Sequence, residues 1–398
     1  MIAMKKKKKA LSDIIIVGIG MTPVGEHWGK SIRELALDAI TAARSDAAGL
    51  KPQAIFVANM LAPYLSGQTQ LAALLADFAG LRGIEAVTLE AAGASGGIAL
   101  RQAYLALASG LVDTALVVGV EKVTDRSSAE LEAALSTASD ADHEAVHGIT
   151  STAQAAILMR RYIYENNMPA DALAYFSINA HTNAVTNPNA MYRRAIQIED
   201  YTHASMVSEP VNMFDAAPIA DGAAALFLVR DDGSPNMLPH PRVRIAASAA
   251  ISTAVALHDR TDPLELYTSA ESSKLTLQQA GLKHDDIDLF ELHDQYSVYA
   301  ALSLEAVGFA ERGQGWRLAL DGAISRSGRI PICTFGGSKA RGDTGGATGV
   351  YQLAEATLQL QGRAGENQIA NAKIALAQCL GGAGATAATH ILELVDGS

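Results

Sequence analysis

The run Ala91-Ala92-Gly93-Ala94-Ser95-Gly96-Gly97 has the form of a turn that presents a residue to a cleft. It follows a short apolar stretch, 87–89, and precedes a long apolar segment, 98–111. A strand, a tight turn and a buried helix in this order place helix N–H donors beside the turn, where they can stabilise a developing oxyanion. The run contains no cysteine, histidine or carboxylate, so this turn offers backbone donors rather than a strong nucleophile.

The cysteines and histidines form no metal-binding pattern. Cys333 and Cys379 are the only cysteines, and they lie far apart in the chain. The ten histidines show no zinc spacing. We therefore expect no metal, and a reducing cytoplasm rather than a disulfide scaffold.

Alternating strands and helices must position the turn. Continuous apolar strands that alternate with helices predict an α/β fold with a buried, mostly parallel sheet. Ser31 with Glu34 three residues later has the spacing of a capping box at the start of the first helix. The strands are expected at 13–18, 54–58, 87–89, 114–118, 223–229, 243–247, 287–292, 374–378 and 389–394. The helices are expected at 31–47, 69–80, 93–110, 152–166, 170–185, 264–280, 299–307 and 350–360.

Both halves of the chain repeat the same order of elements. In each, a strand runs into a glycine-rich turn and then a long helix, which indicates a coarse internal duplication. The polar, turn-rich segment 129–206 interrupts the first half and is expected to be an excursion over the sheet. Residues 235–241 have the composition of a linker.

Composition excludes several classes of partner. The chain has 398 residues, 49% of them hydrophobic, enough for two domains with their own cores. A net charge of -11 argues against nucleic acid as a partner. No window of eighteen uncharged apolar residues predicts a membrane span. The lysines at 5–9 are expected to be a solvated tail, with a basic recognition tag as the alternative.

From about Ile14 to Leu394 the chain resembles the thiolase superfamily, and within it the sterol-carrier-protein type. The run 91–97 is similar to the family's Cys-Ala-Ser-Gly-Gly nucleophile turn, with Gly93 at the cysteine position. Further similar segments follow in the family's order: 119–125, 183–193 with Asn187-Pro188, and 215–225.

The resemblance implies a duplicated five-layer α-β-α-β-α thiolase fold with an inserted loop domain. We expect a basic tail (1–12), an N-terminal thiolase domain (13–128 plus 207–234), a loop domain (129–206) and a C-terminal thiolase domain (242–398). It also implies a homodimer in which sheet edges meet, and a cytoplasmic role in lipid metabolism.

The family's catalytic positions can be carried over one at a time. His293, in His293-Asp294-Gln295-Tyr296, matches the histidine that holds the thioester oxygen with a water. Gln295 stands where sterol-carrier-type enzymes can have a cysteine. Asp343 stands where the family has the histidine that activates the thiol. Cys379, in Cys379-Leu380-Gly381, matches its acid/base cysteine.

These departures change the chemistry that the resemblance implies. Glycine cannot form an acyl-enzyme, and a carboxylate beside a thiolate would raise the thiol pKa, so Asp343 suits a site without a thiol. Backbone amides near Gly93 and Gly382 could donate to an oxyanion, with Asp343 and Cys379 as proton-transfer groups. Together with His293, these parts could stabilise the enolate of an acyl-CoA.

Each site residue also has a purely structural interpretation. Gly93 could fill a tight helix start, Asp343 could cap a turn, and His293 could be a hydrogen-bonded core histidine. Cys379 could be a small buried hydrophobe. For Ser95, a structural role in the turn is favoured over that of a substitute nucleophile.

Four further features remain open. Cys333 is expected to be packed in the core. His147 with Gly148 could line the substrate cleft or lie in a surface loop. The anionic end of CoA favours a positive patch, for which the candidates are Arg193, Arg194, Lys339 and Arg341. The favoured interpretation of these four is ordinary solvated surface charge.

Three functions follow from these observations. The leading hypothesis is a CoA-thioester-binding enzyme of aldol or retro-aldol type that works without an acyl-cysteine and needs no tightly bound cofactor. The first alternative is a noncatalytic or scaffolding subunit, since some relatives assemble with a small OB-fold, zinc-ribbon protein. The second is an ordinary acetyl-CoA acyltransferase, against which the missing thiol argues.

Overall fold

The computed structural model describes residues 13–169, 171–231 and 239–395. The expected tail 1–12 and most of the expected linker 235–241 lie outside the described residues.

A nine-stranded sheet, in the order β3-β2-β4-β7-β1-β8-β11-β10-β9, organises the described part of the chain. Its first half contains β1 (Ile14–Met21), β2 (Ala54–Ala58), β3 (Glu85–Leu89), β4 (Thr114–Glu121) and β7 (Gly222–Arg230). Its second half contains β8 (Val243–Ser252), β9 (Leu289–Glu291), β10 (Ile374–Gly381) and β11 (Thr386–Leu394). The halves meet through a short pairing of Ile15 with Arg244 and Ile16 with Val243.

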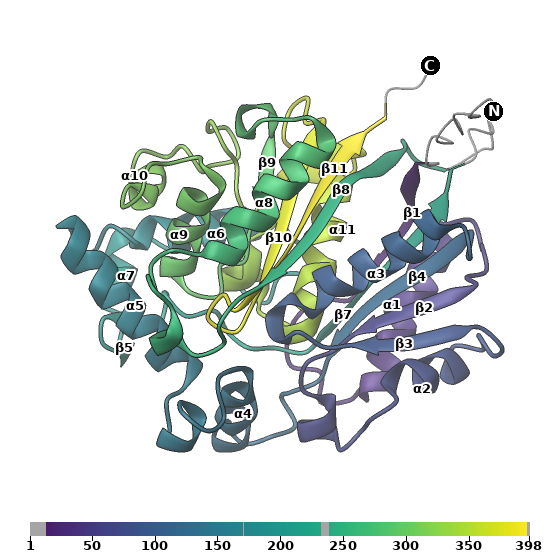
Figure 1. Ribbon diagram of the computed structural model, residues 1–398, viewed down its shortest axis with the longest axis horizontal. Helices are drawn as coiled ribbons and strands as arrows, with labels where there is room; N and C mark the ends of the chain where they lie inside the picture. Colours follow the sequence, from purple (N-terminus) through teal and green to yellow (C-terminus); the bar gives the residue numbers. More distant parts are fainter. Residues whose placement is uncertain (1–12, 170, 232–238, 396–398) are drawn as a thin grey trace, which may run out of the picture.

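Helices cover and separate the two halves, which confirms the duplicated five-layer arrangement (Figure 1). α1 (Ile32–Asp46) and α2 (Leu71–Phe78) pack on the outer face of the first half. α3 (Ser95–Ser109) and α11 (Thr348–Leu360) share one core with strands of both halves. α8 (Tyr267–Ala280), α9 (Ser297–Val307) and α10 (Gly315–Leu320) lie on the second half's outer side.

The expectation of a mostly parallel sheet is wrong. Among the pairs of strands in this sheet, the parallel ones are β2–β3, β2–β4 and β9–β10. The pairs β1–β7, β4–β7, β1–β8, β8–β11 and β10–β11 are antiparallel. A continuous apolar run indicates that both faces of a strand are covered. In this sheet helices cover both faces of parallel and antiparallel strands alike, so the run does not indicate strand direction.

Most expected elements occur within a few residues of their predicted bounds. The capping box is present: the Glu34 amide donates to Ser31 Oγ (3.4 Å), and the Ser31 amide donates to the Glu34 carboxylate (2.8 Å). The structure adds α4 (Ser128–Leu135), α10 and the short pair β5 (Met206–Ser208) and β6 (Val211–Asn212). These elements are too short for hydrophobic periodicity to reveal them.

The excursion 129–206 contributes to the core of the second half. Besides α4 it contains α5 (Ser151–Asn166), α6 (Ala174–Ala184) and α7 (Ile198–Thr202). Side chains of α5 and α6, such as Leu158 and Phe176, share a cluster with Leu292 and Tyr299. The excursion is therefore anchored beside β9 and α9, close to the segment that carries His293.

The two central helices approach each other at their N-termini. A Cβ on Gly96 would lie 2.6 Å from the Val350 amide nitrogen and 2.8 Å from Gly349 Cα, so only glycine allows this approach. Each helix follows a short 3₁₀ turn, Ala92–Ala94 before α3 and Gly345–Ala347 before α11. The duplication therefore brings two glycine-rich turns, 92–97 and 345–349, to one place. In the described part of the chain no helix is long and apolar enough to cross a bilayer.

Candidate functional site

A small cavity of about 30 Å³ lies at these paired turns. Gly93, His293, Asp343 and Gly382 all line it, although they come from four separate segments of the chain. Gln295 lines it too. A cavity of this size holds roughly two water molecules, so it admits only the reacting end of a substrate.

The turn at Gly93 points its missing side chain at His293. A Cβ on Gly93 would lie 2.9 Å from His293 Cε1, 3.3 Å from Nε2 and 2.6 Å from the Leu380 carbonyl oxygen. Ala92 holds the turn with a φ of 50°, a backbone conformation that L-residues rarely adopt. The space that a side chain at position 93 would need is therefore already taken by His293 and Leu380.

His293 is a buried residue in the wall of the cavity. Burial lowers its pKa, and the carboxylates of Asp343 and Asp294 oppose that effect. A neutral imidazole carries one N–H, which it can donate to an oxygen in the cavity. Its Nδ1 atom is buried and has no hydrogen-bond partner in the described part of the chain.

One oxygen of the Asp343 carboxylate is fixed by its own loop. Oδ1 accepts from the Gly345 amide (3.1 Å) and from Thr348 Oγ1 (2.7 Å). Oδ2 receives no hydrogen bond from a residue that the structure describes. The Asp343 backbone is tied to the segment 218–220: its amide donates to the Pro218 carbonyl (2.8 Å) and its carbonyl accepts from Ala220 (2.9 Å). The side chain is therefore anchored through one oxygen while the other can exchange a proton.

Glu121, which the sequence did not single out, holds the cavity walls together. Its Oε2 accepts from the amides of Met60 (2.9 Å) and Gly346 (3.0 Å), and its Oε1 from Leu61 (3.1 Å) and Asn59 Nδ2 (2.8 Å). Burial raises the pKa of Glu121 to about 7, although the four hydrogen bonds lower it. The sequence offered one signal for Glu121: it lies in the segment 119–125, which resembles a thiolase segment.

Several apolar lining residues were also missed. Met60 follows β2, Leu135 and Ala138 belong to the excursion, and Tyr299 lies on α9. No motif or spacing in the sequence marks these positions, because only the folded chain brings them to the cavity.

Cys379 does not line the cavity. Its Sγ lies 2.7 Å from the position of a Cβ on Gly97 and 2.6 Å from that on Gly349, so the thiol is packed between α3 and α11. Burial raises its pKa to about 12, which keeps the thiol protonated. This geometry favours the small buried hydrophobe over the proton-transfer group.

Three other candidates have structural surroundings. Ser95 Oγ donates to the Ala92 carbonyl (2.6 Å) and accepts from the Ala91 amide (2.8 Å), so it braces the turn. Cys333 is buried, and burial raises its pKa well above the ordinary value. His147 and Gly148 are exposed and are not among the cavity's lining residues.

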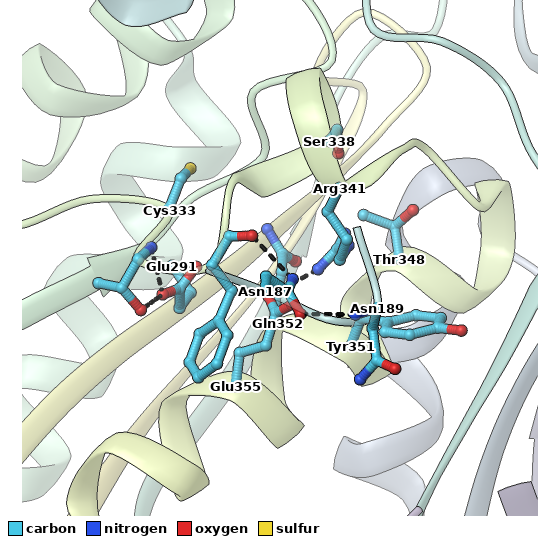
Figure 2. Close-up of polar contacts among 12 residues, drawn as sticks. Asn187, Asn189, Glu291, Cys333, Ser338, Arg341, Thr348, Tyr351, Gln352 and Glu355 are labelled. Atoms are coloured by element: carbon cyan, nitrogen blue, oxygen red, sulfur yellow. Dashed lines mark hydrogen bonds and ion pairs between the residues drawn. The ribbon is translucent and has the colours of Figure 1, made fainter. Parts of the chain in front are cut away.

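For Lys339 and Arg341, the expectation of solvated surface charge is wrong. Arg341 is fully buried and its Nη1 donates to Glu355 at 2.7 Å (Figure 2). Lys339 is buried too, and its Nζ donates to the Asp215 carbonyl (2.6 Å). Both lie on the π-helix Gly337–Arg341, which packs against α6. Arg193 and Arg194 are exposed, as expected.

The Asn187 side chain helps to place that π-helix. Its Nδ2 donates to the Phe335 carbonyl (2.8 Å), and its Oδ1 accepts from the Asn189 amide (2.9 Å; Figure 2). The loop 187–189 therefore docks on the segment that leads to Asp343.

Together the lining groups can hold an oxygen and move a proton. His293, Gly93, Gly382 and Asp343 all line this one cavity. That combination suits stabilisation of an enolate. No cysteine is among the described lining residues, and Ser151, which lines the cavity, has no hydrogen bond to a histidine in the described part of the chain. These residues therefore do not form the pair of nucleophile and base that covalent catalysis needs.

Comparisons with known proteins identify the relatives of this chain. A family description "Thiolase, N-terminal domain" matches residues 14–232, and "Thiolase C-terminal domain-like" matches 249–394. An acetyl-CoA acetyltransferase of Methanothermobacter thermautotrophicus is 39% identical over 96% of this chain and 100% of its own length. The 17-hydroxy-3-oxo-4-pregnene-20-carboxyl-CoA lyase of Mycobacterium tuberculosis is 28% identical over 87% of this chain and 91% of its own. A solved "Ltp2-ChsH2(DUF35) aldolase" structure matches with a TM-score of 0.83 and 24% identity, covering 98% of this chain and 100% of that one.

Proposed function

Because this chain belongs to the thiolase family, we propose that it binds an acyl-CoA thioester in the cavity and catalyses aldol or retro-aldol chemistry through an enolate, without an acyl-cysteine. The observation that carries this proposal is the geometry at Gly93. The turn meets His293 and Leu380 so closely that any side chain at position 93 would have to displace one of them. The remaining lining groups, an oxygen-binding histidine and a carboxylate, are those that enolate chemistry needs.

In the proposed reaction the thioester carbonyl oxygen accepts the N–H of His293 and backbone N–H groups near Gly93 and Gly382. In the cleavage direction, Asp343 removes the proton of the β-hydroxyl group. The Cα–Cβ bond then breaks, its electron pair moves into the enolate, and a carbonyl product leaves. The protonated Asp343 then transfers its proton to the enolate carbon, which completes the reaction, and the reverse sequence forms the bond. By the same step in reverse, Asp343 removes an α-proton from a thioester that has no β-hydroxyl group.

The names of the relatives support this proposal at a coarse level. One relative is named as a CoA-thioester lyase and a structural neighbour as an aldolase, so related chains break or form carbon–carbon bonds. The more similar relative is named as an acetyltransferase, which keeps acyl transfer as the second candidate.

The proposal is tested by proton exchange at the α-carbon. The protein is incubated with acetyl-CoA or propanoyl-CoA in D₂O, and loss of the α-proton signal is followed by NMR. We expect exchange in the wild type, its loss in Asp343→Asn with retained thioester binding, and no effect of Asp46→Asn. Asp46 is a suitable control because it is a partly buried carboxylate that bonds Ile19, His240 and Arg363, away from the cavity. Absence of exchange in the wild type would refute the proposal.

Intact-mass spectrometry distinguishes acyl transfer, the second candidate, from the proposed aldol chemistry. An acyltransferase of ping-pong type forms an acyl-enzyme, so acetyl-CoA should leave an adduct on a cysteine. We expect none on Cys333 or Cys379, because burial raises the pKa of both thiols. A stoichiometric adduct on either would favour acyl transfer.

We further propose a homodimer that also binds a partner of the DUF35 class, the class named in the aldolase neighbour. The strand β3 lies at the end of the sheet, and its Val87 is exposed, so it offers a free edge. Native mass spectrometry of the purified chain tests the dimer. A monomer alone would contradict it. The assembly is tested by repeating the measurement after a DUF35 protein is added, and a heavier species that contains both proteins would support it.

A further inference from the structure

A second and much larger pocket, of about 530 Å³, lies behind the wall of the cavity. The segment 216–218 lines it and is bonded to cavity residues from the other side. The Ala217 amide donates to the Gln295 carbonyl (2.8 Å), and the Pro218 carbonyl accepts from Asp343 (2.8 Å). Since the two spaces share no lining residue, the rear pocket is a separate site.

The walls of the rear pocket are mainly apolar and aromatic. The His181 ring stacks on Tyr192 at 6.2 Å and meets Phe214 edge-on at 5.6 Å. Met213 and Val207 are 58% and 57% exposed at its rim. Apolar side chains that line a pocket of this size form the usual surroundings of a small organic ligand.

One end of the pocket contains a buried cation. Lys339 is 2% exposed, and its Nζ donates to the carbonyls of Phe214 (3.2 Å) and Asp215 (2.6 Å). An ammonium group has three donors, so one has no acceptor among the described residues. Within the described chain no carboxylate oxygen lies within 4.0 Å of this nitrogen. A buried charge without a counter-ion is costly, and a ligand anion would offset that cost.

The other charged groups leave room for such an anion. Asp215 and Asp294 attract Lys339 at longer range, and neither forms an ion pair with its Nζ. Asp215 Oδ2 accepts from Tyr201 Oη (2.8 Å) and from the Asn212 amide (3.1 Å), whereas its Oδ1 is buried with no partner among the described residues. Asp294 Oδ1 accepts from the Ser338 amide (2.6 Å). At the exposed rim, Arg194 and Asp200 carry opposite charges.

We propose that the rear pocket binds a small apolar carboxylate, whose anionic group meets Lys339 and whose hydrocarbon part lies against Phe214 and the rim residues. A monoanion fits better than a phosphate, because one buried ammonium supplies the only buried cation among the described lining residues. Burial lowers the pKa of Lys339, and the bound carboxylate would favour its charged form. This site is independent of the function proposed above.

Calorimetric titration with octanoate, and with octanamide as a neutral isostere, tests the proposal. The catalytic cavity shares no lining residue with the rear pocket, so variants at the rim of the rear pocket distinguish binding at the two sites. We expect octanoate to bind at least about tenfold more tightly than octanamide, because only the anion pairs with the ammonium. Equal affinities, or no octanoate binding up to the millimolar range, would overturn the proposal.

Matched variants avoid dependence on a buried lysine whose loss could unfold the chain. Met213 and Met206 are similarly exposed, at 58% and 60%, but only Met213 lines the pocket. We expect Met213→Glu to weaken octanoate binding several-fold through like-charge repulsion, while Met206→Glu leaves it unchanged. Lys339→Met, if its thermal transition stays cooperative, should remove the preference for octanoate over octanamide. Equal effects of both glutamate variants would place the anion elsewhere and refute the site.

Discussion

A methyl group at position 93 is expected to destabilise this protein, although glycine-to-alanine changes in helical turns usually stabilise. The added Cβ would lie 2.6 Å from the Leu380 carbonyl oxygen and 2.9 Å from His293 Cε1. Leu380 belongs to β10 in the middle of the second half of the sheet, so its carbonyl cannot move without disturbing the strand. His293 is buried and has little freedom to turn away.

The magnitude follows from two opposing effects. Overpacking of a filled interior costs about 1–3 kcal/mol. Replacing glycine by alanine where φ is compatible restricts the unfolded chain and raises the free energy of unfolding by about 0.4–1 kcal/mol. The net expectation for Gly93→Ala is therefore a loss of about 1–2 kcal/mol in the free energy of unfolding, which lowers Tm by a few °C.

Thermal denaturation of Gly93→Ala beside Gly29→Ala provides the assay. A Cβ on Gly29 meets no atom within 4 Å, so that variant should be as stable as the wild type or slightly more so. Gly93→Cys should lose at least as much stability, and incubation with acetyl-CoA should leave no acetyl group on its new thiol, because the neighbouring Asp343 carboxylate raises a thiol pKa. Unchanged Tm in Gly93→Ala, or efficient acylation of Gly93→Cys, would refute the argument that the turn has closed around glycine.

Three further perturbations test buried polar groups. Burial lowers the pKa of His390 from 6.5 to about 3. As the pH drops below 6.5, the unfolded chain takes up a proton that the folded chain does not, so the free energy of unfolding falls by about 1.4 kcal/mol per pH unit. In urea denaturation, the change in the free energy of unfolding between pH 7 and pH 5 should therefore be smaller for His390→Phe than for the wild type. Glu121→Gln replaces one acceptor oxygen by an NH₂ group that cannot accept backbone amides, so hydrogen exchange should accelerate in the segments 59–62 and 343–348, and an unchanged pattern would contradict its positioning role. Arg341→Met leaves Glu355 buried without its partner and should cost about 3–5 kcal/mol in denaturant unfolding, whereas Arg341→Met with Glu355→Leu should recover most of that loss.

Local signals in the sequence were sufficient for the elements and for the family. The capping box at Ser31, the apolar strands and the two glycine-rich turns depend on neighbours a few residues apart, and the structure contains each of them. Strand direction was not predictable in this way, because covering a strand on both faces produces the same apolar run in either direction.

The candidate site was only partly predictable. Gly93, His293, Asp343 and Gly382 were found through motifs, and they line one cavity. Cys379 lies in an equally good motif, yet its side chain is packed between α3 and α11. Side chains alternate along β10, and only the packed helices decide which space each one enters.

The sequence by itself determined that position 93 has no nucleophile, since glycine supplies none in any fold. Only the tertiary structure decided what surrounds that position: a histidine, a carbonyl oxygen and a carboxylate from distant segments. It also decided that Lys339 and Arg341 are buried rather than solvated. The reason is that burial and contact depend on residues more than a hundred positions apart, such as Phe214 beside Lys339, and no local pattern records such an encounter.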